Sequence, residues 1–229
     1  MKKLGLIGGT TWVSTVDYYT YINSGVNEIL GGSSSAECLV YSLNFGEIYK
    51  NIELDDWDAN LKIFTDAAIK LIHAGAEGIV LCANTAHIMA DSLSERISVP
   101  IIHIVTATAN EINQAGIKTA GLLGTKFTME RDFFKAKLSG LGIEAIIPDE
   151  EDREFIHNSI FNELGKNVFR PETKQRYISI IDKLISRGAE GIILGCTEIP
   201  LIIKQADSKI TVFDTTKIHS KAAVDFALS

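Results

Sequence analysis

Two short polar segments, each at the end of an apolar run, carry the residues best suited to chemistry. CANTAH covers 82–87 and GCTE covers 195–198. Each holds a cysteine, and a thiolate can act as a base or a nucleophile when its surroundings favour the charged form. Cys38, the third cysteine, lies inside an apolar stretch and is expected to be structural. Cys82 and Cys196 are therefore the candidates for thiol chemistry.

The elements that must position these thiols form an alternating series of strands and helices. That pattern predicts an α/β fold with parallel sheets flanked by helices. Strands are predicted at 3–8, 36–42, 77–82, 100–104, 119–123, 143–147, 190–195 and 210–213. Helices are predicted at 14–30, 56–74, 107–115, 127–139, 150–163, 172–187 and 216–228.

A repeat divides this series into two halves. KLIHAGAEGIVL at 70–81 and KLISRGAEGIIL at 183–194 agree at nine of twelve positions, with an offset of 113. GLIGG at 5–9 and GLLGT at 121–125 match at an offset of 116. Coincidence is the alternative, because such sequences suit many helix-to-strand turns. Two separate matches at nearly the same offset favour two similar lobes.

The predicted strand ends are rich in small polar residues. Ligands of open parallel sheets bind beyond the carboxyl ends of the strands, where helix N-termini point inward. The segments at those ends are GGTTW (8–12), NFGEI (44–48), CANTAH, GTKFT (124–128) and GCTE. Backbone N–H groups and short hydroxyls suit a carboxylate, so a small anion is the expected ligand, in a cleft if the lobes face each other.

Composition and motifs exclude several other classes. The 229 residues carry a net charge of -7 and no basic run, which argues against nucleic acid and anionic membrane surfaces. No apolar stretch reaches signal-peptide or membrane-span length and there is no CxxC, so a reduced, cytoplasmic protein is expected.

Nucleotide and metal sites are equally poorly supported. GLIGGTTW lacks G-x-G-x-x-G spacing, and no GxxxxGK[ST] occurs. The five histidines are scattered through the sequence without ligand spacing, so no metal site is expected. The acidic run PDEEDRE at 148–154 is interpreted as the cap of a helix N-terminus.

The motifs together resemble those of a known family. GLIGGTTWVSTVDYY resembles the opening GLIGGMSWEST-YY signature of the pyridoxal-phosphate-independent aspartate/glutamate racemases, and NTAH, LLGTKFTM, PDEEDRE and GCTEI resemble later blocks of that family in the same order. The resemblance covers essentially the whole chain. It implies Cα proton transfer on an acidic amino acid by cysteine, without a cofactor.

The resemblance also implies an architecture. Members have two α/β lobes related by a pseudo-twofold axis, with the amino acid between them, and are commonly homodimers. The last helix returns to the first lobe. The expected domains are therefore 1–100 with 214–229, and 101–213.

The register of the repeat separates the two thiols. At an offset of 113, Cys196 corresponds to Ala83 and Cys82 to Gly195. Two-cysteine family members have their first cysteine directly before Asn, and here Ala83 stands before Asn84. Neighbouring strand residues point to opposite faces, so Cys82 is expected to point away from the cleft unless the strand has already ended. Cys196 is the preferred base, and Cys82 a weaker candidate.

Other residues are assigned around Cys196. Glu198 is expected to orient or deprotonate the thiol, or else to cap the next helix. Residues expected to hold the substrate are Thr10, Thr11, Asn84, Thr85, Thr125, Lys126, Thr128, Lys166 and Thr197. For many of these, helix capping needs the same residue types. For the loop residue Lys166, plain solvation is the alternative.

The resulting functional hypothesis is an aspartate and/or glutamate racemase biased toward one enantiomer. A methyl group at Ala83 neither gives nor takes a proton, and family members without cysteine at this place favour one enantiomer. Two alternatives stay open: a non-catalytic protein that binds acidic amino acids, and a related isomerase or decarboxylase of another small acid.

Overall fold

The computed structural model describes all residues from 1 to 229 and divides them into two compact units. The first unit comprises 1–103 and 219–229, and the second comprises 104–218. The expected boundaries followed residues 100 and 213, so each division falls a few residues later. The C-terminal helix α11 (Thr215–Leu228) begins in the second unit and ends in the first.

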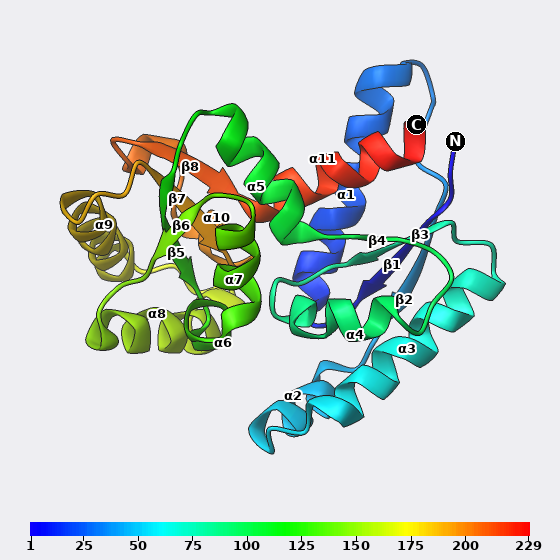
Figure 1. Cartoon of the computed structure of the whole chain (residues 1–229), viewed down its shortest axis with the longest axis horizontal. Coiled ribbons are helices and arrows are strands. Elements are labelled where there is room, and N and C mark those ends of the chain that lie inside the picture. Colours follow the sequence, from blue (N-terminus) through cyan, green and yellow to red (C-terminus); the bar gives the residue numbers. More distant parts are fainter. The chain divides into compact units, whose positions relative to one another are not determined.

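The first unit is built on a four-stranded parallel sheet with the order β2-β1-β3-β4 (Figure 1). Its strands are β1 (Leu4–Gly8), β2 (Cys38–Ser42), β3 (Gly78–Leu81) and β4 (Ile101–Ile102). Its helices are α1 (Trp12–Leu30), α2 (Phe45–Glu53), α3 (Trp57–His73), the 3-10 helix η1 (Thr85–Met89), α4 (Ala90–Ser94) and most of α11.

Two separate apolar clusters cover the two faces of this sheet. Leu6 and Val80 pack with side chains of α1 and α11, including Tyr18 and Val224. Side chains of the opposite face, such as Leu81, pack with α2, α3 and α4. A parallel sheet buried on both faces needs apolar residues at successive strand positions, which explains the continuous apolar runs of the sequence.

The second unit repeats the same sheet topology, with the order β6-β5-β7-β8. Its strands are β5 (Thr119–Gly124), β6 (Glu144–Ile146), β7 (Gly191–Gly195) and β8 (Thr211–Asp214). Its helices are α5 (Ile104–Gln114), α6 (Lys126–Glu130), α7 (Asp132–Gly140), α8 (Glu150–Asn162), η2 (Leu164–Lys166), α9 (Pro171–Ser186), α10 (Ile199–Ile202) and η3 (Gln205–Asp207). The predicted α/β fold with two similar parallel sheets is confirmed.

Strand register matches between the units as the sequence repeat requires. Leu4 pairs with Gly78 across β1 and β3, and Ala120 pairs with Gly191 across β5 and β7. The first residues are 116 positions apart and the second are 113 apart, which are the two offsets of the sequence repeat. The repeat is therefore structural, and positions in one unit have defined counterparts in the other.

A hydrogen-bonding detail shared by the two halves explains the glutamate in the repeated GAEG sequence. Glu77 accepts a hydrogen bond from the backbone N–H of Lys3 at 2.8 Å. Its counterpart Glu190 accepts from the N–H of Thr119 at 3.0 Å and from that of Lys118 at 2.8 Å. Each glutamate thus binds backbone at the start of the neighbouring central strand. The bonds to Glu190 lower the pKa of its carboxyl group.

Local sequence also fixes where helices begin and break. Thr11 caps α1 and Asp149 caps α8, and each side chain accepts a hydrogen bond from a first-turn N–H group. The interpretation of PDEEDRE as a cap is therefore confirmed. The single helix predicted at 127–139 was wrong, because extended backbone at Arg131 divides it into α6 and α7. The short helices α2, α4 and α10 were not predicted.

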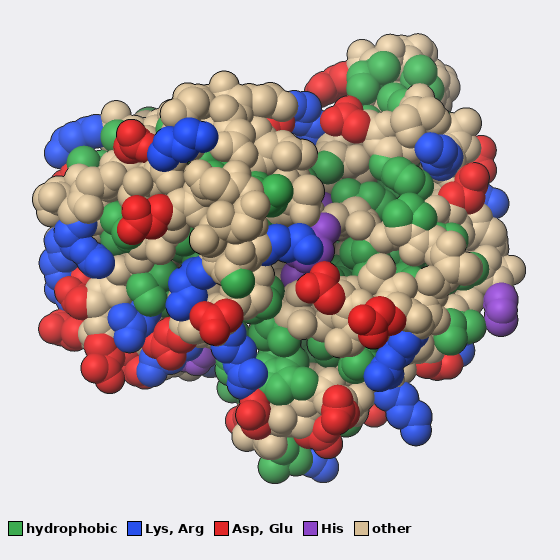
Figure 2. All heavy atoms as spheres, in the orientation of Figure 1, with side chains coloured by type: hydrophobic (Ala, Val, Ile, Leu, Met, Phe, Trp, Pro, Cys, Tyr) green, Lys and Arg blue, Asp and Glu red, His purple; other side chains and the backbone are tan.

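Charged side chains of both signs lie on the visible surface. Figure 2 shows Lys and Arg side chains interspersed with Asp and Glu over the visible face of each unit. None of the helices combines the length and the apolar character that crossing a membrane would require.

Candidate functional site

The loop that follows β7 brings a thiol, a hydroxyl and a carboxylate together. Cys196 Sγ donates a hydrogen bond to Glu198 Oε2 at 2.9 Å, and Thr197 Oγ1 donates to the same oxygen at 2.8 Å. All three residues are less than a tenth exposed. Glu198 stands at the N-cap of α10 but makes no side-chain capping bond. Its carboxylate therefore accepts hydrogen bonds from the Cys196 thiol and the Thr197 hydroxyl instead of capping the helix.

Burial and charge determine the protonation of Cys196. Burial and the neighbouring Glu198 carboxylate raise the pKa of the thiol well above its ordinary value, while the backbone amides of Glu198 and Thr197 act in the opposite direction. The resting thiol is therefore protonated, with a carboxylate in place to receive its proton. A thiolate formed here would lie in a water-poor environment, where it is a stronger base than in water.

The loops after β5 and β7 begin side by side, because the last residues of these strands, Gly124 and Gly195, are paired. A Cβ atom added at Gly195 would lie 2.9 Å from Leu123 O and 3.1 Å from Thr128 Cγ2. A Cβ added at Gly124 would similarly lie 2.9 Å from Gly195 O. These glycines permit close backbone contact between the two loops. Such contact brings the GTKFT and GCTE segments together within the second unit.

Thr125 and Thr128 form the polar lining of that contact. Thr125 caps α6 by accepting from the Thr128 N–H at 3.3 Å, and the two hydroxyls lie 3.2 Å apart. Both side chains are buried. The structure thus shows the capping role for Thr125. Its hydroxyl therefore contacts both the backbone N–H and the hydroxyl of Thr128.

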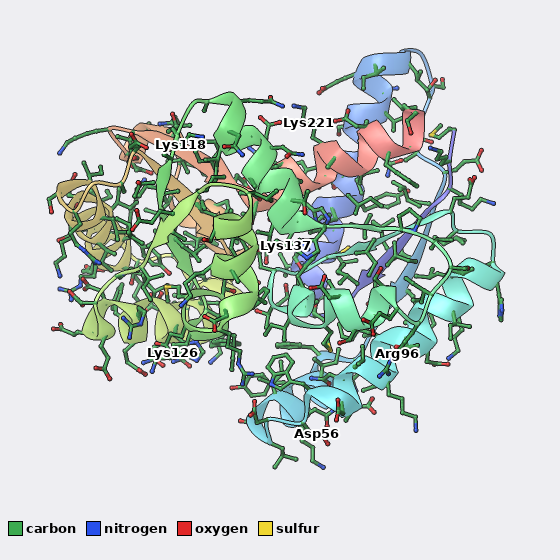
Figure 3. The ribbon with its side chains drawn as sticks, in the orientation of Figure 1. Asp56, Arg96, Lys118, Lys126, Lys137 and Lys221 are labelled. Atoms are coloured by element: carbon green, nitrogen blue, oxygen red, sulfur yellow. The ribbon has the colours of Figure 1, made fainter.

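The two lysines assigned to the substrate have different environments. Lys126, which is labelled in Figure 3, forms an ion pair with Glu154 of α8, and its backbone N–H donates to His157 Nδ1 at 3.2 Å. Contact between the Lys126 ammonium group and a substrate carboxylate would require this pair to open. Lys166 is exposed at the end of η2, where Asn167 adopts a left-handed conformation.

In the first unit, Cys82 and Ala83 face different clusters. Cys82 is fully buried beside Leu6 and Tyr18 in the apolar cluster under α1 and α11. Ala83 is half-buried and packs with the cluster on the other face. The alternation expected of a strand thus continues past the end of β3. Burial raises the pKa of Cys82, so this thiol stays protonated as a side chain of the apolar cluster, on the face of the sheet opposite to Ala83.

The polar residues near Ala83 are organised by backbone contacts. Asn84 is buried at the N-terminus of η1, and Thr85 is the first residue of that helix. Thr11 is engaged as the α1 cap, whereas Thr10 Oγ1 is a buried hydroxyl oxygen with no hydrogen-bond partner. A buried hydroxyl without a partner carries an energetic cost that a bound polar group would relieve. Thr10 is therefore the residue of this group with the clearest capacity for a ligand.

Glycine shapes the loop that carries these threonines. Gly9 has a φ of +83° and donates its N–H to Thr15 Oγ1 at 2.8 Å. A Cβ at Gly9 would lie 2.1 Å from the carbonyl oxygen of Leu43. Only glycine fits this backbone conformation and this close approach.

The structure also gathers three histidines that the sequence presents as scattered. His87, His103 and His219 lie in one cluster of the first unit, with ring centroids 4.8 Å apart for His87 and His103 and 5.3 Å apart for His87 and His219. Only the helical spacing of His87 from Ala83 is visible in the sequence; convergence of the three segments is not. The histidines do not form a group of residues arranged to hold a metal ion.

The fold and the loop chemistry define an α/β enzyme with a buried, carboxylate-paired thiol at a strand end. The family model for Asp/Glu/hydantoin racemases matches residues 7–223. The chain is 27% identical to the broad specificity amino-acid racemase RacX of Bacillus subtilis over 232 residues, which cover 99% of this chain and 98% of the relative.

Solved structures give the same assignment. A candidate Asp/Glu racemase from Yersinia pestis is 45% identical with a TM-score of 0.95, and an aspartate racemase homologue from Pyrococcus horikoshii is 39% identical with a TM-score of 0.88. Each comparison covers 100% of both chains. The chain belongs to the Asp/Glu/hydantoin racemase family and is an amino-acid racemase, an isomerase. The resemblance seen in the sequence motifs is confirmed.

Proposed function

We propose that this racemase acts on aspartate, glutamate or both by proton transfer at Cα, with Cys196 as the base and no cofactor. The observation that carries the proposal is the hydrogen bond from the Cys196 thiol to Glu198 in a member of this family. Relatives described as Asp/Glu or aspartate racemases support the substrate class.

The chemical step follows from that pair. Glu198 takes the thiol proton, leaving a thiolate and a carboxylic acid. The thiolate then removes the Cα proton, and the electron pair of that C–H bond passes into an enolate-like anion of the α-carboxylate. Because a Cα proton is far less acidic than an ordinary thiol of pKa about 8.5, the thiolate must be poorly solvated and the anion must be stabilised. Buried hydroxyls and backbone N–H groups supply such stabilisation.

The substrate carboxylates are assigned to the polar strand-end residues. Thr125, Thr128 and Thr197 lie in or against the Cys196 loop, and their side chains are buried. In the first unit, Thr10, Thr11, Asn84 and Thr85 are assigned the same task, supported most strongly by the unpartnered hydroxyl oxygen of Thr10. Lys126 and Lys166 are assigned to the side-chain carboxylate, with Lys126 in competition with its partner Glu154.

A stereochemical bias is part of the proposal. Racemisation needs a proton to leave one face of Cα and another to arrive on the opposite face. Ala83 holds the register position that corresponds to Cys196, and a methyl group cannot transfer a proton. One face is therefore served by a thiol and the other by water or a weaker acid. Exchange at Cα is expected to be fast for one enantiomer and slow for the other.

Deuterium exchange tests these points together. Each enantiomer of aspartate and glutamate is incubated with the enzyme in D2O, then examined by NMR for Cα deuteration and by chiral chromatography for inversion. We expect exchange of one enantiomer to exceed that of its mirror image, and loss of at least ~100-fold in the Cys196→Ser variant. A Cys196→Ser variant with full exchange would refute the catalytic assignment.

A second candidate, a broader substrate range, is favoured by the similarity to RacX, whose name states broad specificity. The same assay with neutral and basic amino acids decides between the two. Exchange restricted to acidic amino acids supports the narrower proposal. Saturable binding without exchange would favour a binding protein. Absence of both binding and exchange with every amino acid would favour a different small acid as the substrate.

A further inference from the structure

A buried imidazole holds the backbone at the position where the first unit lacks its thiol. His87 Nδ1 lies 3.0 Å from the carbonyl oxygen of Ala83. A carbonyl oxygen can only accept, so Nδ1 carries the proton and donates it. His87 is 2% exposed and lies one helical turn beyond Ala83. The bond therefore fixes the peptide that joins Ala83 to Asn84.

Neighbouring rings fix the orientation of that imidazole. His219 is completely buried; its Nε2 lies 2.6 Å from Ile102 O and must donate, so its Nδ1 accepts from Tyr18 O–H at 2.8 Å. The His219 ring meets His87 edge to face, and His103 packs on His87 at a tilt. The His87 ring is thus packed between rings from two other segments, His103 just after β4 and His219 of α11. Packing on several sides leaves His87 little freedom to rotate.

The preceding peptide is held in the same manner. Ser14 Oγ of α1 lies 3.1 Å from the carbonyl oxygen of Cys82. Two successive carbonyl groups, those of Cys82 and Ala83, are therefore contacted by buried polar side chains. All peptide bonds of the chain are trans, so each carbonyl direction also sets the direction of the N–H group in the same peptide.

The second unit has no equivalent of this arrangement. At the offset of 113, the counterpart of His87 is Pro200, which has no side-chain donor. In the loop that carries Cys196, the carboxylate of Glu198 binds the thiol. In the loop that carries Ala83, the imidazole of His87 binds the backbone carbonyl group. The two loops have thus diverged in how they are held as well as in which of them carries a base.

We infer that His87 is a positioning residue for substrate binding: by holding the Ala83 carbonyl, it sets the backbone from which Asn84 and Thr85 project toward the amino acid. This inference rests on the proposed function, in which those two residues contact a substrate carboxylate. Loss of the imidazole donor should weaken binding of the amino acid far more than it changes the chemistry at Cys196.

A matched set of substitutions tests the inference. His87→Leu removes the donor and roughly keeps the side-chain volume, whereas His87→Asn is smaller and places an amide nitrogen near the position of Nδ1. Because asparagine fills less of the site than leucine, tighter binding by His87→Asn than by His87→Leu would report the hydrogen bond and not the packing. His87→Gln places its amide nearer the position of Nε2 and serves as a misplaced donor.

The readouts are KM and kcat for Cα exchange of the amino acid that the wild-type enzyme exchanges. We expect His87→Leu and His87→Gln to raise KM by about tenfold or more, with kcat changed by less than about threefold, and His87→Asn to recover most of the affinity. Alkylation of Cys196 and urea unfolding are measured in parallel. Unchanged Cys196 reactivity verifies that the second unit is intact.

Two results would overturn the inference. One is a His87→Leu variant with wild-type KM, and the other is a His87→Asn variant as impaired as His87→Leu at equal stability. Either result, with normal exchange by the wild-type enzyme, leaves the proposed function standing. Absence of exchange by the wild-type enzyme itself would refute the proposed function and this inference with it.

Discussion

The carboxylate of Glu198 accepts hydrogen bonds from both residues that precede it, with Cys196 Sγ at 2.9 Å and Thr197 Oγ1 at 2.8 Å from the same oxygen. Three consecutive residues therefore carry the proposed base, the carboxylate proposed to accept its proton, and a hydroxyl that binds that carboxylate. One carboxylate oxygen engaged by both donors is well placed to exchange a proton with the thiol.

Glu198→Gln should separate thiol ionisation from catalysis. The carboxylate raises the pKa of Cys196, so its removal should shift thiol alkylation to lower pH while exchange at Cα falls by about 100-fold. Iodoacetamide alkylation across a pH series measures the first effect, in a Cys38→Ser background because Cys38 is half-buried. Glu151→Gln, which removes an exposed carboxylate of the same unit, is the control. An unchanged alkylation profile in Glu198→Gln would contradict the pairing.

Ala83→Cys should reduce the stereochemical bias. The substitution places a thiol at the register position that corresponds to Cys196, so the slower enantiomer gains a group able to transfer a proton. The ratio of exchange rates for the two enantiomers is expected to fall by about tenfold or more. Cys82→Ala is the matched control and should leave the ratio unchanged, since Cys82 lies in the apolar cluster. A folded Ala83→Cys enzyme with the original ratio would count against the role assigned to Ala83.

Gly9→Ala should destabilise the protein strongly. A methyl group there would lie 2.1 Å from Leu43 O, on a backbone with a φ of +83°. The expected loss in free energy of unfolding is roughly 2–4 kcal/mol, measured by urea denaturation. Gly32→Ala is the control, because Gly32 has a φ of +60° but open space around its Cα, and should cost about 1 kcal/mol. Equal losses in the two variants would show that the contact with Leu43 is unimportant.

Acid should destabilise the first unit through its buried histidines. Burial lowers the pKa of His219 from 6.5 to about 4, and burial with the neighbouring imidazoles lowers that of His87 as well. The unfolded chain binds more protons between these values, so the free energy of unfolding falls as the pH drops below 6.5. The fall due to His219 levels off below about pH 4 and amounts to about 3 kcal/mol.

His219→Gln isolates that contribution. Glutamine places an amide near the position of Nε2, where it can still donate to Ile102 O, but it does not titrate in this range. Urea denaturation from pH 7 to pH 4 should give a shallower pH dependence for the variant than for the wild-type protein. Identical slopes would exclude His219 as a source of the acid sensitivity.

The sequence by itself determined the eight strands, the α/β class, the racemase family and the counterpart relation between Cys196 and Ala83. These features depend on local apolar periodicity and on a repeat whose two offsets survive in the strand register. The cap at Asp149 was also predictable, because its partner Asp152 is three residues away.

Only the tertiary structure determined which partners the polar side chains contact. It turned Glu198 toward Cys196 instead of the α10 N-terminus, paired Lys126 with Glu154, and gathered His87, His103 and His219 around one another. Glu198 had two candidate partners close to it in sequence. The Lys126–Glu154 pair and the histidine cluster join segments that lie far apart in the sequence. Local propensity does not encode such contacts, because they depend on where packed helices and strand ends meet in space.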